Sequence, residues 1–208
     1  MIGRLFDWLQ ARRSTKAAAI RAEQGDVEAQ IELGRFYEWG IGVRRDERKA
    51  RQWYLRAAET GHIGGQMALG NSYFQGPPFS EDYREAMKWY RKAAEQGSEW
   101  GQSQLAWMYC SVVPYYTNGV TDYAEGVRWS KKAAEQGNVT AMSALAEMHE
   151  KGKGVQQDYA EAMRWYKMAQ KHGDKSVDFW IRRLLGKPGF AYAQAAKWLS
   201  QNATSENK

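Results

Sequence analysis

A tryptophan recurs along this chain at intervals of 36, 40 and 36 residues, in the same short sequence pattern each time. The four copies are Trp53, Trp89, Trp129 and Trp165. Glycines keep the same period at Gly25, Gly61, Gly97, Gly137 and Gly173. A period of this length indicates stacked helical or β units, because one such unit is too small to bury its own apolar face. The period therefore predicts a repeat protein and argues against a single globular core.

The first half of each repeat is predicted to be a helix, helix A. A small residue is followed four residues later by leucine, then by Gly or Ala, and three residues further by Tyr or His. These spacings place the pattern on one side of a helix. The leucine and the Tyr or His of the four copies are Leu33 and Tyr37, Leu69 and Tyr73, Leu105 and Tyr109, and Leu145 and His149.

The second half, helix B, carries the tryptophan in the pattern Ala-x-x-Trp-Tyr and ends before the closing glycine. An aspartate precedes it at Asp46, Asp82, Asp122 and Asp158, as expected of an N-cap or a first-turn acid. The closing glycine is typical of the residue that ends a helix in the left-handed backbone conformation. The tryptophans are predicted to be core wedges between helices. The third copy departs from the pattern, with Gly126 at the alanine position and Ser130 in place of tyrosine.

This pattern resembles the Sel1-like repeat (SLR), a relative of the tetratricopeptide repeat, over residues 25–172. The resemblance implies an all-α fold, a right-handed α-α superhelix (solenoid) of helix-turn-helix repeats that is commonly bacterial and serves as an adaptor. Disulfide-bearing members of that family have paired cysteines in each repeat, whereas this chain has only Cys110. The four predicted repeats are 25–60, 61–96, 97–136 and 137–172.

The two ends are predicted to be capping segments, because terminal repeats expose one face to water. Residues 1–24 would form an N-terminal capping helix or degenerate repeat. Residues 173–201 would form a degenerate C-terminal repeat, with a helix over 177–185 and Ala195 and Trp198 repeating the helix B pattern. Residues 202–208 are expected to be a disordered tail.

Ile2, Leu5, Phe6, Trp8 and Leu9 share one helical face. That face is expected to pack on the first repeat, and contact of residues 2–9 with a membrane surface is the alternative. A continuous apolar segment long enough for a signal peptide or a spanning helix is absent, so a soluble cytoplasmic protein is expected.

The chain has a net charge of +6, with basic residues gathered at 44–51. Acidic residues are interspersed, and no recognition module accompanies the charge, so RNA binding by this segment is the weaker alternative.

Partner binding is predicted on helix A, on a stripe of positions that lie five and two residues before each leucine and two, five and six residues after it. Besides the candidate contacts given below, the stripe includes Cys110, Thr140, Ser143 and Glu150. Aromatic residues outside the repeat pattern are either binding hot spots or packing between neighbouring A helices. The candidate contacts are Glu28, Ile31, Arg35, Trp39, Met67, Asn71, Phe74, Trp100, Ser103, Trp107 and Glu147. The third repeat adds a loop candidate, since Tyr109 and Asp122 are 13 residues apart where two other copies have nine; this insertion carries Tyr115 and Tyr116.

Catalysis is not expected. His62, His149 and His172 share no metal-ligand spacing, and Cys110 has no base marked in the sequence. The sequence thus predicts a non-enzymatic adaptor for a protein or peptide, with no metal, cofactor or small-molecule substrate. An immunity protein that neutralises a secreted bacterial effector is the sharper alternative, by family analogy.

Overall fold

The structure is a computed structural model that describes residues 2–74, 82–112, 122–187 and 189. Side chains are described for residues 8–74, 82–110, 122–187 and 189. These residues form α-helices and one π-helix, with no strand in the described part of the chain. The predicted all-α repeat fold is confirmed. The chain divides into two compact units, Met1–Gly101 and Gln102–Lys208.

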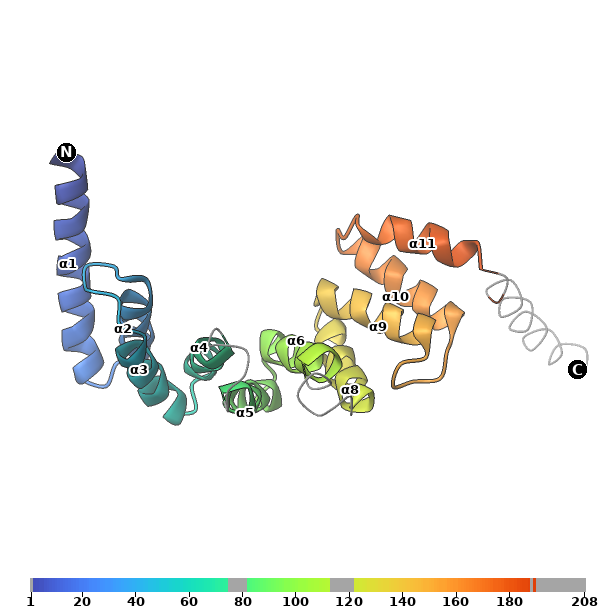
Figure 1. The fold of residues 1–208 in the computed structure, drawn as a ribbon, viewed down its shortest axis with the longest axis horizontal. Helices are drawn as coiled ribbons and strands as arrows, with labels where there is room; N and C mark the ends of the chain where they lie inside the picture. The colour runs from blue at the N-terminus through green and yellow to red at the C-terminus, as the bar shows by residue number, and fades with distance from the viewer. Residues whose placement is uncertain (1, 75–81, 113–121, 188, 190–208) are drawn as a thin grey trace, which may run out of the picture. The chain divides into compact units, whose positions relative to one another are not determined.

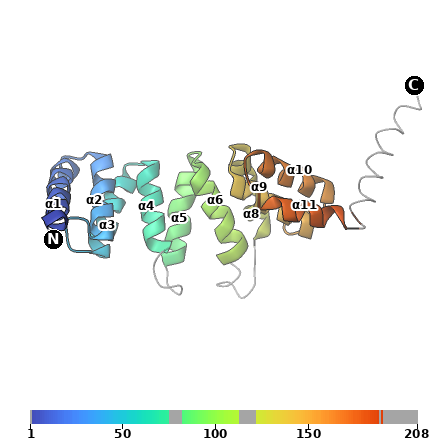
Figure 2. The ribbon, with the colours of Figure 1, turned by 90° about the horizontal axis from the view of Figure 1, so that it is seen from above.

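In the first unit each helix packs on the next one in the chain, and α2 also contacts α4 (Figures 1 and 2). Helices α2 and α4 are A helices, and α3 and α5 are B helices. The elements are α1 (Ile2–Glu23), α2 (Val27–Trp39), α3 (Glu47–Glu59), α4 (Ile63–Phe74) and α5 (Asp82–Glu95).

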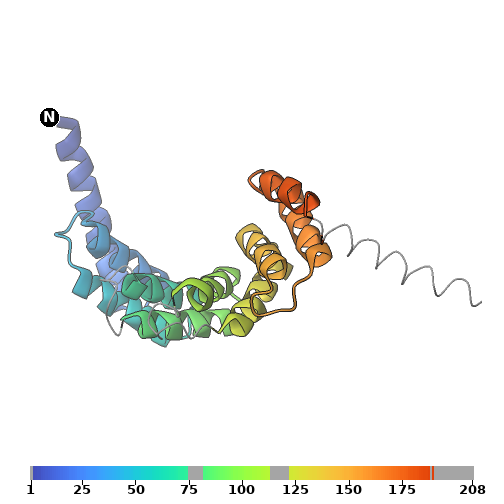
Figure 3. The same ribbon diagram turned by 45° about the vertical axis from the view of Figure 1, so that its right-hand side comes forward.

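In the second unit α8 packs on η1 and α9, and α10 packs on α9 and α11 (Figure 3). The A helix of the third repeat is α6 (Glu99–Trp107), which continues directly into the π-helix η1 (Met108–Val112). The remaining elements are α8 (Tyr123–Glu135), α9 (Val139–Lys151), α10 (Tyr159–Lys171) and α11 (Val177–Leu185).

The helix boundaries confirm the predicted capping chemistry. Asp46 Oδ1 accepts from the Lys49 amide at 3.0 Å, and Asp122 and Asp158 cap α8 and α10 in the same way. Asp82 is the first residue of α5. The five closing glycines have φ between 87° and 102°, a region that residues with a Cβ seldom adopt. The regular spacing of caps and glycines therefore sets the length of each repeat.

The core of each repeat is built from the residues that recur. The four helix A leucines are at most 1% exposed. Trp89, Trp129 and Trp165 are 6%, 1% and 6% exposed, which confirms that they are core wedges. Trp53 is half-buried and packs against a cluster of Ala22, Ala29 and Leu33.

Among the described side chains of the N-terminal helix, the buried ones lie in its second half. Thr15, Ala18 and Ala22 of α1 are buried, and the Thr15 hydroxyl donates to the carbonyl of Ile41 at 2.8 Å. Trp8 and Leu9 are 48% and 45% exposed, so neither side chain is buried against the first repeat. The A–B turn of that repeat lies against Ala11, Arg12 and Thr15 of α1. The side chains of Ile2, Leu5 and Phe6 lie outside the described residues.

At the other end α11 matches the helix expected over 177–185, and it buries Val177 and Leu184. Ala195, Trp198 and the segment 202–208 lie outside the described residues. Among the residues that the structure describes, no helix has both the length and the apolar composition needed to cross a bilayer.

Candidate functional site

Three tryptophans that fall outside the repeat pattern are exposed on A helices. The exposed fractions are 68% for Trp39 on α2, and 56% and 46% for Trp100 and Trp107 on α6. Glu28 and Arg35 of α2 are exposed as well. The stripe thus contains large apolar side chains that the cores of the repeats do not use.

Part of the stripe is buried instead. Ile31, Met67 and Glu150 are 3%, 8% and 1% exposed, so the expectation that they face outward is wrong. Ile31 packs in a core cluster with Tyr54 of α3 and Leu69 of α4. The reason is geometric: α2, α4 and α9 each contact both their own B helix and the helix that precedes them, so the buried arc is wider than the leucine–tyrosine pattern suggests.

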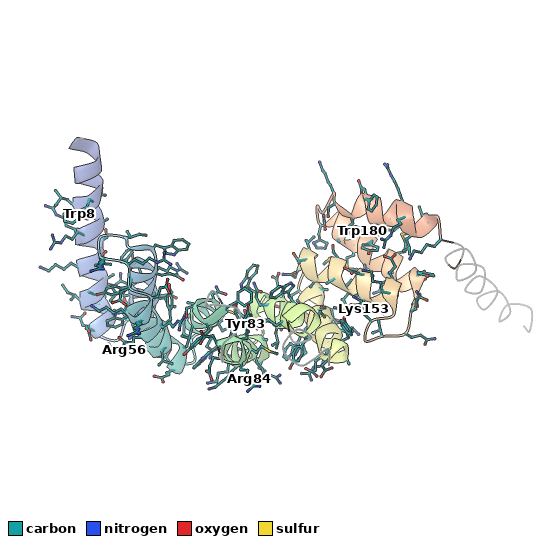
Figure 4. The ribbon with its side chains drawn as sticks, viewed as in Figure 1. Trp8, Arg56, Tyr83, Arg84, Lys153 and Trp180 are labelled. Carbon is teal, nitrogen blue, oxygen red and sulfur yellow. The ribbon has the colours of Figure 1, made fainter. Side chains whose placement is uncertain are left out.

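Two further candidates are engaged in contacts inside the first unit. The Asn71 side chain accepts a hydrogen bond from the Tyr90 hydroxyl at 2.7 Å. The Phe74 ring meets the ring of Tyr83, labelled in Figure 4, edge to face at 5.5 Å. Both side chains remain partly exposed. Both partners belong to α5, the B helix of the same repeat, whereas the alternative expected packing between neighbouring A helices.

The tyrosine of the helix B pattern fills the space beside helix A in three repeats. A Cβ on Gly34 would lie 2.4 Å from Cε1 of Tyr54, so the ring lies directly on the glycine. The Tyr54 hydroxyl donates to Glu38 at 2.8 Å, and the Tyr166 hydroxyl donates to Glu150 at 3.1 Å. Burial raises the pKa of Tyr54 strongly, and the hydrogen bond to Glu38 adds to the rise. These phenols therefore stay neutral and act as packing groups.

The third repeat has a pocket of about 220 Å³ at the position where the other repeats have the helix B tyrosine. Its floor is buried and its rim is partly or fully exposed. The floor consists of Ala106, Ser130, Ala141 and Met148, and the rim includes Ser103, Trp107, Thr140, Glu147 and Lys153. The pocket brings together the stripe residues Ser103, Trp107, Cys110, Thr140 and Glu147, all from the second unit. Lys153 is labelled in Figure 4, on the turn after α9.

Cys110 also lines this pocket and explains one departure from the repeat pattern. A Cβ on residue 126 would lie 2.4 Å from Cys110 Sγ, so the glycine makes room for the sulfur. Cys110 belongs to the π-helix η1, a type of segment often found near functional sites. Burial raises the pKa of its thiol to about 11, which keeps it protonated at neutral pH and unsuited to nucleophilic chemistry.

Glu150 is the centre of a structural ion cluster. Its carboxylate pairs with Arg183 and with Lys187, whose Nζ is 2.9 Å from Oε1, and it accepts the Tyr166 hydrogen bond. Burial alone would raise the pKa of Glu150, but the hydrogen bonds from Lys187, Arg183 and Tyr166 outweigh it and the net pKa is lowered. The cluster fastens α11 and Lys187 to α9.

The described residues contain no group of three or more His, Cys, Asp or Glu side chains placed to hold a metal ion. His62 Nε2 lies 3.2 Å from a Glu28 carboxylate oxygen, and His149 is half-buried at a position where other repeats have tyrosine. The loop candidates Tyr115 and Tyr116 lie outside the described residues.

The basic segment of the first unit borders an open hollow of about 1180 Å³, together with Trp8 and Arg12 of α1. Two acids interrupt its charge. Asp46 caps α3, and Glu47 pairs with Arg45 at 2.6 Å. The positive field that an RNA backbone would require is therefore reduced at this place.

The fold defines an all-α helical-repeat protein, and comparison with known proteins gives its family. The Sel1 repeat model matches residues 27–62, 64–98, 115–138 and 139–174, which is more than half of the chain. The chain belongs to the Sel1 repeat family. Sel1 repeat proteins generally act as scaffolds for protein–protein interaction and are not a family of enzymes. The third match starts after η1, so α6 and the π-helix lie outside it.

Two solved structures support this assignment. A protective antigen of uropathogenic Escherichia coli strains that displays an SLR fold is 28% identical, with a TM-score of 0.71 over 92% of this chain and 41% of the antigen. A Sel1 repeat protein from Oxalobacter formigenes is 29% identical, with a TM-score of 0.68 over 84% of this chain and 72% of that protein. The chain thus spans less than half the length of the antigen. A search of curated proteins gave no match.

Proposed function

We propose that this chain is a non-enzymatic scaffold that binds a partner polypeptide on the exposed face of its A helices. The observation that carries the proposal is the contrast between two sets of tryptophans. Trp89, Trp129 and Trp165 follow the repeat period and are at most 6% exposed, whereas Trp39, Trp100 and Trp107 fall outside it and are 46–68% exposed.

Exposed tryptophans on a repeat surface are best explained by a partner. Fully burying a large apolar side chain stabilises a complex by about 1.5–3 kcal/mol, and tryptophan is enriched among interface hot spots. The charges near them are mixed: Glu28 and Arg35 lie on α2, and Glu147 and Lys153 lie beside Trp107 at the pocket. Mixed charge suits a polypeptide better than a phosphate backbone.

The proposed contacts are taken separately for the two units. Ile31 and Met67 are excluded because they are buried in the core. In the first unit the contacts are Glu28, Arg35, Trp39, Asn71, Phe74 and Trp100, and in the second unit they are Ser103, Trp107 and Glu147.

Affinity capture from the source organism tests the proposal. The tagged wild-type chain is compared with a variant that carries Trp39→Ala, Trp100→Ala and Trp107→Ala, with captured polypeptides identified by mass spectrometry. Trp8→Ala is the matched control, because Trp8 is 48% exposed but belongs to α1 and not to an A helix. A polypeptide captured by the wild type and the control but lost with the triple variant supports the proposal. Equal capture by all three would remove the helix A face from consideration.

A further inference from the structure

The pocket in the third repeat lies where the other repeats place a tyrosine ring. Tyr54, Tyr90 and Tyr166 directly follow the periodic tryptophans, are at most 2% exposed, and are packed into the cores of their repeats. Ser130 follows Trp129 at the same position and is equally buried, at 1% exposed. The serine keeps the position but lacks the ring.

Three residues that line the pocket occupy the same repeat positions as residues around Tyr54. Gly34, on which the Tyr54 ring lies, corresponds to Ala106, because both directly follow the helix A leucine. Glu38, the acceptor of the tyrosine hydroxyl, corresponds to Cys110. Both Ala106 and Cys110 line the pocket.

The next A helix contributes the opposite wall in both places. In the first repeat α4 supplies Leu69 and Ala68 to the cluster around Tyr54. In the third repeat α9 supplies Ala144 to the pocket, at the position that corresponds to Ala68. The fold therefore builds a similar three-helix socket in the third repeat, and Ser130 leaves the position of the tyrosine ring unfilled by helix B, while Trp107 and Tyr123 line the socket from the side.

We propose that this socket receives an aromatic side chain, phenylalanine or tyrosine, from the partner polypeptide. The inference deepens the proposed function and rests on it. A ring supplied by the partner would replace the intramolecular tyrosine and complete the packing that the other repeats achieve alone.

The size of the pocket favours one ring and no more. An apolar cavity of about 150 Å³ holds benzene, whereas sites for whole drug-sized ligands measure about 300–1,000 Å³. At about 220 Å³ the pocket takes one ring and leaves the rest of its owner outside, as a side chain of a bound peptide would be.

The chemistry of the walls agrees with this occupant. Ala106, Ala141 and Met148 give a buried apolar floor, and a methionine sulfur makes favourable contacts with aromatic rings. At the rim the exposed Trp107 offers a second aromatic surface, and Glu147 and Lys153 offer charged groups for the peptide backbone.

The first test uses the full chain and small probes. N-acetyl-phenylalaninamide and N-acetyl-tyrosinamide are titrated against the ¹⁵N-labelled protein, with N-acetyl-alaninamide as the probe without a ring. We expect ring-dependent shifts of the amides of α6, α8 and α9 around the pocket, with a Kd of about 1 mM, as is usual for a single ring. The absence of such shifts in the wild type would overturn the proposal.

Variants of the pocket sharpen this test. Ser130→Tyr restores the repeat pattern and fills the socket from within, so probe binding should weaken roughly tenfold or more. Lys131→Tyr is the matched control, because it adds a tyrosine to α8 at an exposed position outside the pocket lining, and it should bind as the wild type does. Thr140→Trp obstructs the rim from an exposed position on α9, and it should also weaken binding. Unchanged binding in both Ser130→Tyr and Thr140→Trp would refute the pocket as the site.

A second test asks whether the ring belongs to a polypeptide. A random peptide library is selected on the wild-type chain after depletion on Ser130→Tyr. Enriched peptides with Phe or Tyr at one fixed position support the proposal, and enriched peptides without an aromatic residue contradict it. Capture of a partner without ring binding would end this inference and leave the scaffold function intact. Ring binding without any polypeptide ligand would show that the pocket binds an aromatic ring. It would contradict both the polypeptide occupant and the scaffold function.

Discussion

The Glu150 cluster allows a quantitative prediction about how the C-terminal helix is held. Glu150→Gln removes the negative charge that Arg183 and Lys187 face but keeps an oxygen that can accept from Tyr166. Hydrogen bonds to charged groups contribute about 1.5–3 kcal/mol each, and breaking a fully buried ion pair costs about 3–5 kcal/mol. The side chains of Arg183 and Lys187 are 37% and 34% exposed and can regain water. We therefore expect Glu150→Gln to lower the free energy of opening of α11 by about 2–3 kcal/mol.

Amide hydrogen exchange measures this loss where it occurs. Local opening of α11 breaks the cluster in the wild type. In Glu150→Gln the protection of the α11 amides should therefore be about 30- to 140-fold lower than in the wild type, at 1.4 kcal/mol per factor of ten. Glu147→Gln is the control on the same helix, because Glu147 pairs with Lys151 at the surface. An exposed pair of this kind is worth about 0.3–0.5 kcal/mol, or roughly twofold. Equal protection in the two variants would refute the role of the cluster.

The same cluster predicts a dependence on pH. The folded state lowers the pKa of Glu150, so the stabilisation is complete above the ordinary glutamate pKa of about 4.3. It is lost as the pH falls through that value and on through the lower folded pKa. After correction for intrinsic exchange rates, the opening free energy of α11 should decrease on acidification in the wild type. Glu150→Gln should not show this component.

Two further predictions concern packing and are read from urea unfolding. Trp129→Ala should reduce the free energy of unfolding by about 3–5 kcal/mol, whereas Trp39→Ala should change it by no more than about 0.5 kcal/mol, because only Trp129 is buried. Similar losses would contradict the distinction between the two sets of tryptophans. Gly126→Ala should lose about 1–3 kcal/mol by overpacking against Cys110 Sγ, and adding Cys110→Ala should restore most of it. A Gly126→Ala variant as stable as the wild type would show that the glycine is not needed for space.

The fold could be predicted because its determinants recur. The leucines, tryptophans and closing glycines return at the same positions of the repeats, so one assignment serves several positions. The aspartate caps could be predicted too, since capping depends only on the residues next to a helix end. The π-helix η1 could not be predicted, because its recurring residue, Tyr109, predicts an ordinary helix A there, and η1 lies in the irregular third repeat.

The candidate site could be predicted only in part. The exposure of Trp39, Trp100 and Trp107 agrees with the stripe, but Ile31 and Met67 are buried. Counting along one helix does not reveal how much of its surface the next repeat covers. The pocket had a visible signal in the serine at position 130, which departs from the tyrosine of the pattern. Its meaning depended on the packing of three helices, and that packing is a property of the folded chain.

The affinity for the captured partner tests the central claim most directly, namely that exposed tryptophans outside the repeat period bind a polypeptide. The measurement is a calorimetric titration of the purified partner with the wild type, Trp8→Ala, and the triple variant of Trp39, Trp100 and Trp107. One hot-spot residue contributes about 2 kcal/mol or more and the values are not additive, so the triple variant should bind at least roughly 30-fold more weakly. Trp8→Ala should bind as the wild type does. A triple variant with the affinity of the wild type would contradict the account.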